Sequence, residues 1–318
     1  MNGLVKPAGS DSLLAESVLQ VDLPLGALAG EALISEVLLS PKPGLVDQWD
    51  RGSHKDLSVL LMVRSAKALV PFFNTMADEG RRAGVASPGL VRDLMGREPL
   101  EVPSTLITLR ERIGEIGREA EARMMRVTQN VNTHRGAIWT LGLLSTAAAL
   151  DPQAARSPAG LCKVAGLLAR LPDRYCRPGL SNGLRAVSRY QVKGAREQAQ
   201  MGFPAIVYTA LPALVASRQR GESQVQARLN TLVALMAILS DTCVLSRAGR
   251  AGLALMQRSA KLIIQSGGVA TDHGYLQLVD LKRGMIAINA SPGGAADLLA
   301  ATLFIDAVVN RAATLAGR

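Results

Sequence analysis

Apolar residues recur at intervals of three and four along most of the chain, the spacing of one face of an α-helix. The clearest case covers residues 105–127, where Ile113, Ile116, Ala120 and Met124 share a face. Further helices are predicted over residues 26–40, 56–79, 134–149, 157–170, 183–200, 204–218, 223–240, 250–265, 272–287 and 292–315. No long linker divides them. We therefore predict an all-α fold, with a loosely ordered leader over 1–25 and a single compact domain of about ten or more helices over 26–318.

Composition supports helices and a reducing environment. Aromatic residues make up only 3% of the 318 residues, whereas strands favour aromatic and β-branched side chains. The three cysteines form no CxxC pair or disulfide framework. The first 25 residues lack the basic and apolar regions of a signal peptide. The apolar stretches 136–150, 202–217 and 229–241 are too short or interrupted to span a bilayer. We expect a cytoplasmic protein without membrane contact.

The chain carries 36 basic and 26 acidic residues, a formal charge of +10. Such a field attracts polyanions. The basic residues are dispersed, and aromatic residues do not alternate with them as in single-strand binders. The pattern favours phosphate binding in clefts over nucleic-acid binding, although solubility alone also explains many of these charges.

Four segments combine polar residues with turn residues. The first runs from Ser40 through Asp47 to Asp56. Its lysines, Lys42 and Lys55, are suited to phosphates, and Asp47 and Asp56 are suited to Mg²⁺. An ordinary surface loop with a helix-capping aspartate explains the same residues.

The second segment, residues 132–136, precedes an apolar helix. Thr133 is a candidate N-cap, and Arg135 could clamp an anion at the helix start. His134 is a candidate for proton transfer or phosphate binding, or else a structural histidine.

The third and fourth segments are residues 240–249 and 289–297. Asp241 follows a long apolar helix, where burial requires a partner or a cation, and Arg247 could be that partner or a phosphate ligand. Ser291 fits a helix N-cap, and the glycines after it allow close approach of a ligand. A well-capped C-terminal helix is the simpler explanation.

Taken together and in order, these segments resemble the triphosphoribosyl-dephospho-CoA synthase family, and its malonate decarboxylase branch more than its citrate lyase branch. The matching stretches are EVLLSPKPGLVD (36–47) with GSHKD (52–56), NTHRGAIWTLGLL (132–144), REQAQMGFPAIVYTALPAL (196–214), SDTCVLSRAG (240–249) and NASPGGAADLLA (289–300). Two positions depart from the family pattern: Cys243 stands where asparagine is common, and Arg135 where lysine is common. The first departure removes a ligand group, whereas the second preserves the charge.

The resemblance implies transfer of the triphosphoribosyl group of ATP to the 2′-hydroxyl of 3′-dephospho-CoA, with release of adenine. The product would be the prosthetic-group precursor of an acyl carrier protein, and Mg²⁺ is expected with ATP. An oxocarbenium-like transition state would need carboxylates nearby. The candidate catalytic residues are Asp241, Asp56, Asp297, His134 and Glu36. The candidate substrate-binding residues are Lys42, Gly44, His54, Lys55, Thr133, Arg135, Glu197, Arg247, Asn289, Ser291, Gly293 and Gly294. The candidate metal ligands are Asp47, Asp56, Asp241 and Asp297.

Two other classes of function stay open at this point. One is a Mg²⁺-dependent helical hydrolase of nucleotide or ribosyl bonds, and the other is a non-catalytic helical protein that binds nucleic acid. A homodimer is plausible, because a helical protein rich in Ala and Leu readily buries one more face.

Overall fold

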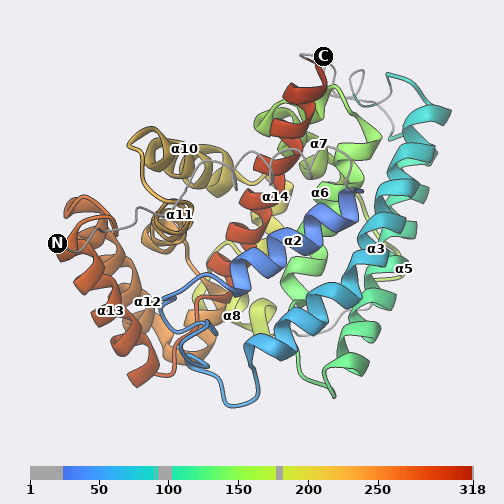
Figure 1. Cartoon of the computed structure of the whole chain (residues 1–318). Helices are drawn as coiled ribbons and strands as arrows, with labels where there is room; N and C mark the ends of the chain where they lie inside the picture. Colours follow the sequence, from blue (N-terminus) through green and yellow to red (C-terminus); the bar gives the residue numbers. More distant parts are fainter. Residues whose placement is uncertain (1–23, 90, 92–101, 177–181, 317–318) are drawn as a thin grey trace.

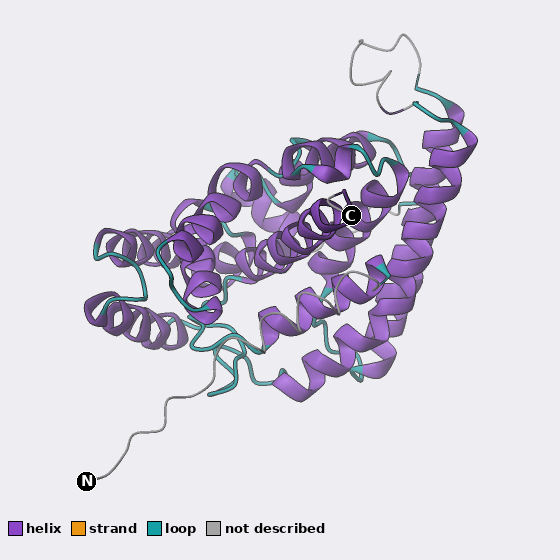
Figure 2. Ribbon diagram, turned by 45° about the horizontal axis from the view of Figure 1, so that its top comes forward, coloured by secondary structure: helices purple, strands orange, loops and turns teal. Residues whose placement is uncertain are grey.

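The computed structural model describes residues 24–89, 91, 102–176 and 182–316. These residues form α-helices joined by loops and contain no strand (Figure 2). The all-α prediction is therefore confirmed. The predicted leader lies outside the described residues except for Pro24 and Leu25, and Leu25 begins the first described helix.

The helices follow the predicted periodic segments closely. They are α2 (Leu25–Val37), α3 (Val59–Ala86), α5 (Ser104–Val127), α6 (Arg135–Leu150), α7 (Pro158–Arg170), α8 (Asn182–Tyr190), α9 (Ala195–Gln200), α10 (Leu211–Gln219), α11 (Gln224–Ile238), α12 (Thr242–Gln265), α13 (Asp272–Ala287) and α14 (Gly293–Ala316). A 3-10 turn covers Ala154–Arg156, and a π-helical turn covers Ile206–Ala210.

Helix α6 is the centre of the molecule. Every residue from Thr140 to Leu150 is buried, because this stretch is apolar or small on all sides. It packs against α2, α3, α5, α7 and α14. Helices α3 and α5 form one flank of the molecule, and α12 and α13 form the opposite flank (Figure 1). Helix α6 belongs to the side of α3 and α5, with which it is in contact.

The predicted boundaries fail where backbone torsions interrupt a periodic pattern. The helix predicted over 183–200 breaks at Gln191, whose φ is 53°, and restarts as α9 after Gly194. Conversely, α12 begins at Thr242 rather than at residue 250. Its kink at Gly249 has φ 63° and ψ −163°, a conformation open essentially to glycine alone. The sequence pattern treated this kink as a helix start.

Helices α3 and α14 are long and apolar enough to cross a membrane, judged by length and composition alone. Neither helix coincides with the apolar stretches 136–150, 202–217 and 229–241. In this structure, 56% of the apolar window of α14 is buried inside the protein, and 28% of that of α3. Helix α14 packs against α2, α6 and α11, whereas α3 packs against α2, α5 and α6. The absence of membrane contact stays a prediction.

Candidate active site

The amino ends of α6, α12 and α14 meet near the carboxyl end of α2. An added Cβ on Gly136, in the first turn of α6, would lie 2.0 Å from Asp297 Oδ2 on α14. An added Cβ on Gly294 would lie 3.0 Å from Asp241 Oδ2 at the start of α12. Helix amino ends carry partial positive charge and free N–H groups. This junction therefore attracts anionic groups.

Asp241 connects two of these helices. Its Oδ1 accepts the backbone N–H groups of Cys243 at 2.8 Å and Val244 at 3.3 Å, which caps its own helix. Its Oδ2 accepts the N–H of Ala295, in α14, at 2.9 Å. Burial raises the pKa of Asp241, although these backbone hydrogen bonds oppose the shift. The side chain thus fills part of the anion site predicted at Gly293 and Gly294.

Asp297 has a different environment. No hydrogen bond or ion pair to its carboxylate is found among the described residues. The side chain is partly exposed, but the surrounding protein removes much of its water. This desolvation, together with the negative charges of Glu36 and Asp241, raises its pKa well above the ordinary value of 3.8. We call Glu36, Asp241 and Asp297 the carboxylate cluster. Within it, Asp297 is the carboxylate that stays available to a substrate.

Glu36, the third member of the cluster, is neutralised by a buried lysine. Lys42 Nζ donates to Glu36 Oε1 at 2.5 Å and to the Glu36 carbonyl at 2.6 Å. Lys42 is 1% exposed and Glu36 is 3% exposed. Lys42 is thus an internal counter-ion rather than the exposed phosphate ligand that its loop suggested.

His134 lies at the start of α6 and is buried. Its Nδ1 is 3.0 Å from Ser65 Oγ, which in turn is 2.7 Å from Thr133 Oγ1. Its Nε2 is buried without a hydrogen-bond partner in the described part of the chain. Burial and the charge of Lys42 lower the pKa of His134 to about 4. The imidazole is therefore neutral at pH 7. Thr133 bonds Ser65 instead of capping the helix as predicted.

A second group of predicted residues surrounds Arg247. Its guanidinium donates to the Ser53 carbonyl at 2.9 Å, to Asn289 Oδ1 at 3.3 Å and to His54 Nδ1 at 3.2 Å. Arginine has no acceptor, so His54 Nδ1 accepts, and His54 Nε2 carries the hydrogen that is donated to Ser291 Oγ at 2.8 Å. Burial, and then the charge of Arg247, lower the pKa of His54 to about 4.

Arg247 is exposed and forms no ion pair with any described acidic residue. Its hydrogen-bond partners among the described residues are neutral acceptors, and they hold the guanidinium in one orientation. An oriented arginine with an uncompensated charge is suited to a phosphate group.

The loop that carries His54 is joined to the start of α14. Ser53 Oγ donates to the carbonyl of Ala290 at 2.6 Å, across 237 residues of sequence. Gly44 has φ 67°, and a Cβ there would lie 2.2 Å from the same carbonyl. Gly44 is therefore a packing residue that lets the two segments meet.

The structure does not bring the four predicted metal ligands together. Asp47 accepts Lys42 N and Lys282 Nζ, at 2.7 Å and 2.5 Å, so its Oδ2 is occupied. Asp56 is exposed, and Asp241 is bound to backbone amides. Among the described residues, no group of three His, Cys, Asp or Glu side chains could hold a metal ion.

Three predicted substrate-binding residues lie apart from the carboxylate cluster. Glu197 caps α9 by accepting the N–H of Gly194 at 2.8 Å. Arg135 pairs with Glu121 on α5, because it faces a side of α6 different from that of Gly136. Lys55 is exposed in the loop before α3.

Sequence reasoning missed Ser65 and Lys282. Lys282 is 5% exposed and is the buried partner of Asp47. Ser65 orients His134 from α3. Neither residue has a local motif around it, so only the packing of distant helices identifies them.

Comparisons with known proteins identify the family of this chain. A family model described as ATP:dephospho-CoA triphosphoribosyl transferase matches residues 23–314. A 2-(5″-triphosphoribosyl)-3′-dephosphocoenzyme-A synthase of Klebsiella pneumoniae is 50% identical over 286 residues, covering 90% of this chain and 95% of the relative. A probable synthase of Stutzerimonas stutzeri is 48% identical over 295 residues, covering 92% and 94%. No solved structure matches the chain.

The protein is thus an all-helical transferase with a nucleotide substrate. It belongs to the ATP:dephospho-CoA triphosphoribosyl transferase family, and it transfers the triphosphoribosyl group of ATP to dephospho-CoA. The family resemblance of the sequence motifs is confirmed.

Proposed function

We propose that the carboxylate cluster is the place where the transfer occurs. The bond between C1″ of the ATP ribose and adenine breaks, and a bond forms between C1″ and the 2′-oxygen of 3′-dephospho-CoA. The hydroxyl proton leaves this oxygen for the general base, and the departing adenine takes up one proton on the nitrogen released from C1″. The observation that carries the proposal is Asp297, which has a raised pKa and no partner at the junction of three helices.

Asp297 is the general base in this proposal. An efficient base has a pKa near the working pH, and the pKa of Asp297 is shifted in that direction. His134 is a weaker candidate, because a pKa of about 4 leaves it little basicity at pH 7. We assign its unpartnered Nε2 to a contact with a substrate hydroxyl.

The remaining carboxylates act through their charge. The departure of adenine leaves positive charge on C1″ and the ring oxygen. Glu36 and Asp241 are fixed by Lys42 and by backbone amides, respectively, so they need little reorganisation to stabilise that charge. Arg247, on the other side of the α14 start, would bind the triphosphate.

Mg²⁺ enters this proposal as part of the ATP substrate. The described residues offer no preformed set of ligands, since the oxygens of Asp47 and Asp241 are already occupied. We therefore assign no step to a resident metal ion. The triphosphate itself supplies hard oxygen ligands.

The test is mass spectrometry of reactions with ATP, dephospho-CoA and Mg²⁺. Asp297→Asn should abolish both adenine release and the coupled product, because the amide cannot accept the proton. Asp280→Asn is the matched control, since Asp280 is exposed on α13 and pairs only with Arg283. Full transfer by Asp297→Asn would overturn the assignment. Adenine release without dephospho-CoA would instead favour a hydrolase.

The wider role is also a proposal. The product would serve as the precursor of the prosthetic group of an acyl carrier protein, of the malonate decarboxylase type, in the cytoplasm. The motif resemblance supports this role. The test is whether purified product, with the downstream transferase, loads a malonate decarboxylase carrier rather than a citrate lyase carrier.

A further inference from the structure

A cavity of about 230 Å³ lies between α5 and α6, beside the segment that follows α7. Pockets for drug-sized molecules hold roughly 300–1,000 Å³. This cavity is therefore matched to one ring system rather than to a whole nucleotide. Its rim includes Arg135, the sequence neighbour of the Gly136 that contacts Asp297.

Part of the cavity wall is formed by glycines and apolar side chains. Gly114 and Gly117 of α5 and Gly142 of α6 contribute no side chains. A Cβ added to Gly117 would meet only the Met76 methyl group, at 3.6 Å. Ile113 and the indole of Trp139 complete the apolar lining. A planar ring fits such a slot better than a tetrahedral group does.

Two N–H groups in the wall lack partners. The Arg110 guanidinium stacks over the Trp139 ring, with 5.0 Å from its carbon to the ring centroid. Arg110 Nε and Trp139 Nε1 are both buried, and neither has a hydrogen-bond partner in the described residues. Arg110 is 6% exposed. Buried donors without partners are costly, so they indicate a ligand with acceptor atoms.

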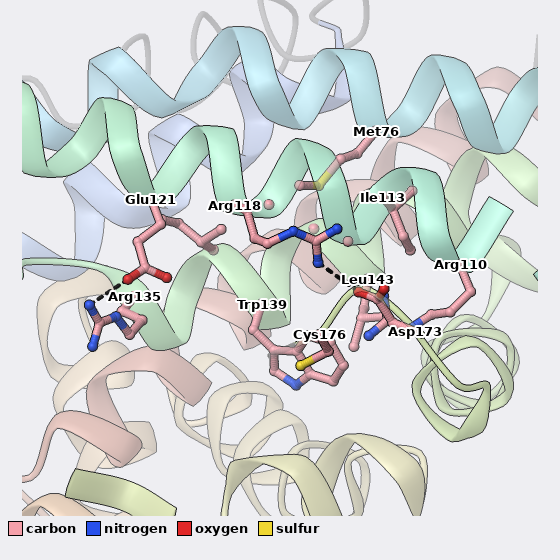
Figure 3. A pocket seen from close by; sticks show the side chains of 14 residues that line it. Met76, Arg110, Ile113, Arg118, Glu121, Arg135, Trp139, Leu143, Asp173 and Cys176 are labelled. Atoms are coloured by element: carbon pink, nitrogen blue, oxygen red, sulfur yellow. Dashed lines mark hydrogen bonds and ion pairs between the residues drawn. The ribbon is translucent and has the colours of Figure 1, made fainter. Parts of the chain in front are cut away.

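The same wall contains an acceptor. Asp173 Oδ2 accepts Arg118 at 2.8 Å and lies 3.6 Å from Arg110 Nη1, and both arginines point toward it (Figure 3). Its Oδ1 accepts the N–H of Tyr175 at 3.0 Å, and the remaining lone pairs of the carboxylate can accept from a ligand. Glu121, at the rim, pairs with Arg135. These two carboxylates disfavour a bare phosphate in the cavity. The two carboxylates favour a ligand that can also donate a hydrogen bond.

We propose that this cavity binds the adenine ring of one of the two substrates. Adenine is planar, its ring nitrogens accept hydrogen bonds, and its amino group donates one, which matches the two free N–H groups and Asp173. The choice of adenine rests on the proposed function, because ATP and dephospho-CoA both carry this base.

Trp139 provides a direct readout. The chain has two tryptophans. The other one, Trp49, is 56% exposed and does not line the cavity. In Trp49→Phe, the emission comes from Trp139 alone. Free adenine, ATP and dephospho-CoA should each be titrated, with inorganic triphosphate as a probe without a base. We expect a saturable emission change with adenine and with one substrate. No response to any base, or a response to triphosphate alone, overturns the proposal.

A cavity-filling variant identifies the substrate. Gly117→Leu places a side chain in the open space and suits a helix better than glycine. It should raise the KM of one substrate at least roughly tenfold with kcat little changed. If the KM for ATP rises, the cavity binds the adenine of ATP. If the KM for dephospho-CoA rises, it binds the adenine of dephospho-CoA. Gly284→Ala, where the added Cβ would lie 3.7 Å from Leu255, is the control. Unchanged KM values for both substrates with correctly folded protein contradict the proposal.

The two proposals fail separately. If Asp297→Asn keeps full turnover while Trp139 responds to adenine, the active-site assignment fails and the cavity stands. If Trp139 is silent in a Trp49→Phe protein that still turns over, the cavity proposal fails alone.

Discussion

Asp241, the cap of α12, also holds the first turn of α14, since its Oδ2 lies 2.9 Å from the backbone nitrogen of Ala295. One carboxylate thus fixes two helix starts, and α14 carries Asp297 directly after this turn. A side chain that orients the catalytic helix need not touch the substrate. This arrangement explains why the helix start predicted to bind phosphate is partly filled by the protein's own anion.

Gly136→Ala should reduce turnover strongly while the fold persists. The new Cβ would lie 2.0 Å from Asp297 Oδ2, so the carboxylate must move. Alanine in place of a helical glycine otherwise stabilises by about 0.5–1 kcal/mol. Steady-state kinetics test the expected loss of turnover, and thermal melting tests whether the fold persists. Both are measured for Gly136→Ala and for the Gly284→Ala control. Wild-type kcat in Gly136→Ala would show that the position of Asp297 is unimportant.

Asp297→Asn should stabilise the protein at neutral pH. The folded pKa of Asp297 lies above its ordinary 3.8, so its ionisation destabilises the folded state as pH rises above that value. The uncharged amide removes this penalty. Removing such a functional charge typically adds about 0.5–2 kcal/mol, and the gain should disappear as pH falls toward 3.8. Melting curves from pH 4 to 8 test this; a gain that does not change with pH contradicts it.

Lys42→Met should destabilise the protein by about 3–5 kcal/mol, because Glu36 is left as a buried unpaired charge. Adding Glu36→Gln should recover most of the loss, since both charges are then gone. Urea unfolding of the two variants measures this difference. Transfer should stay low in the double variant. If Lys42→Met were as stable as the wild type, Glu36 could not be buried beside Lys42 as the structure shows.

Arg247→Ala should raise the KM for ATP by roughly 10- to 100-fold, the worth of about one charged hydrogen bond. Arg258→Ala, further along the same helix and exposed, is the matched control. Because the pKa of His54 is about 4, its charge does not change between pH 6 and 8. The KM for ATP should therefore show no step from His54 in that range. Equal KM values for the two variants would remove Arg247 from the triphosphate site.

Periodicity was sufficient for most of this fold because its helices bury continuous apolar faces. It failed at α12, whose first two turns, before Gly249, contain polar residues that interrupt the apolar pattern. The motifs located Asp241 and Asp297, but no local pattern shows that one caps the helix of the other. Arg135 and Gly136 are neighbours, yet successive helical residues face different sides. The sequence alone cannot determine which of the two meets the carboxylate cluster.

The hydrogen bond from Ser53 to Ala290 joins an early segment of the chain to a late one. Because synthesis proceeds from the amino end, this contact cannot form before both segments have been made. The loop with Gly44 and His54 is made early, but the surface that fixes it arrives 237 residues later. Until then Arg247 lacks Asn289 as a partner and Asp297 does not exist. A nascent chain can therefore be extensively helical while the carboxylate cluster is still incomplete, because Asp297 lies on the last helix.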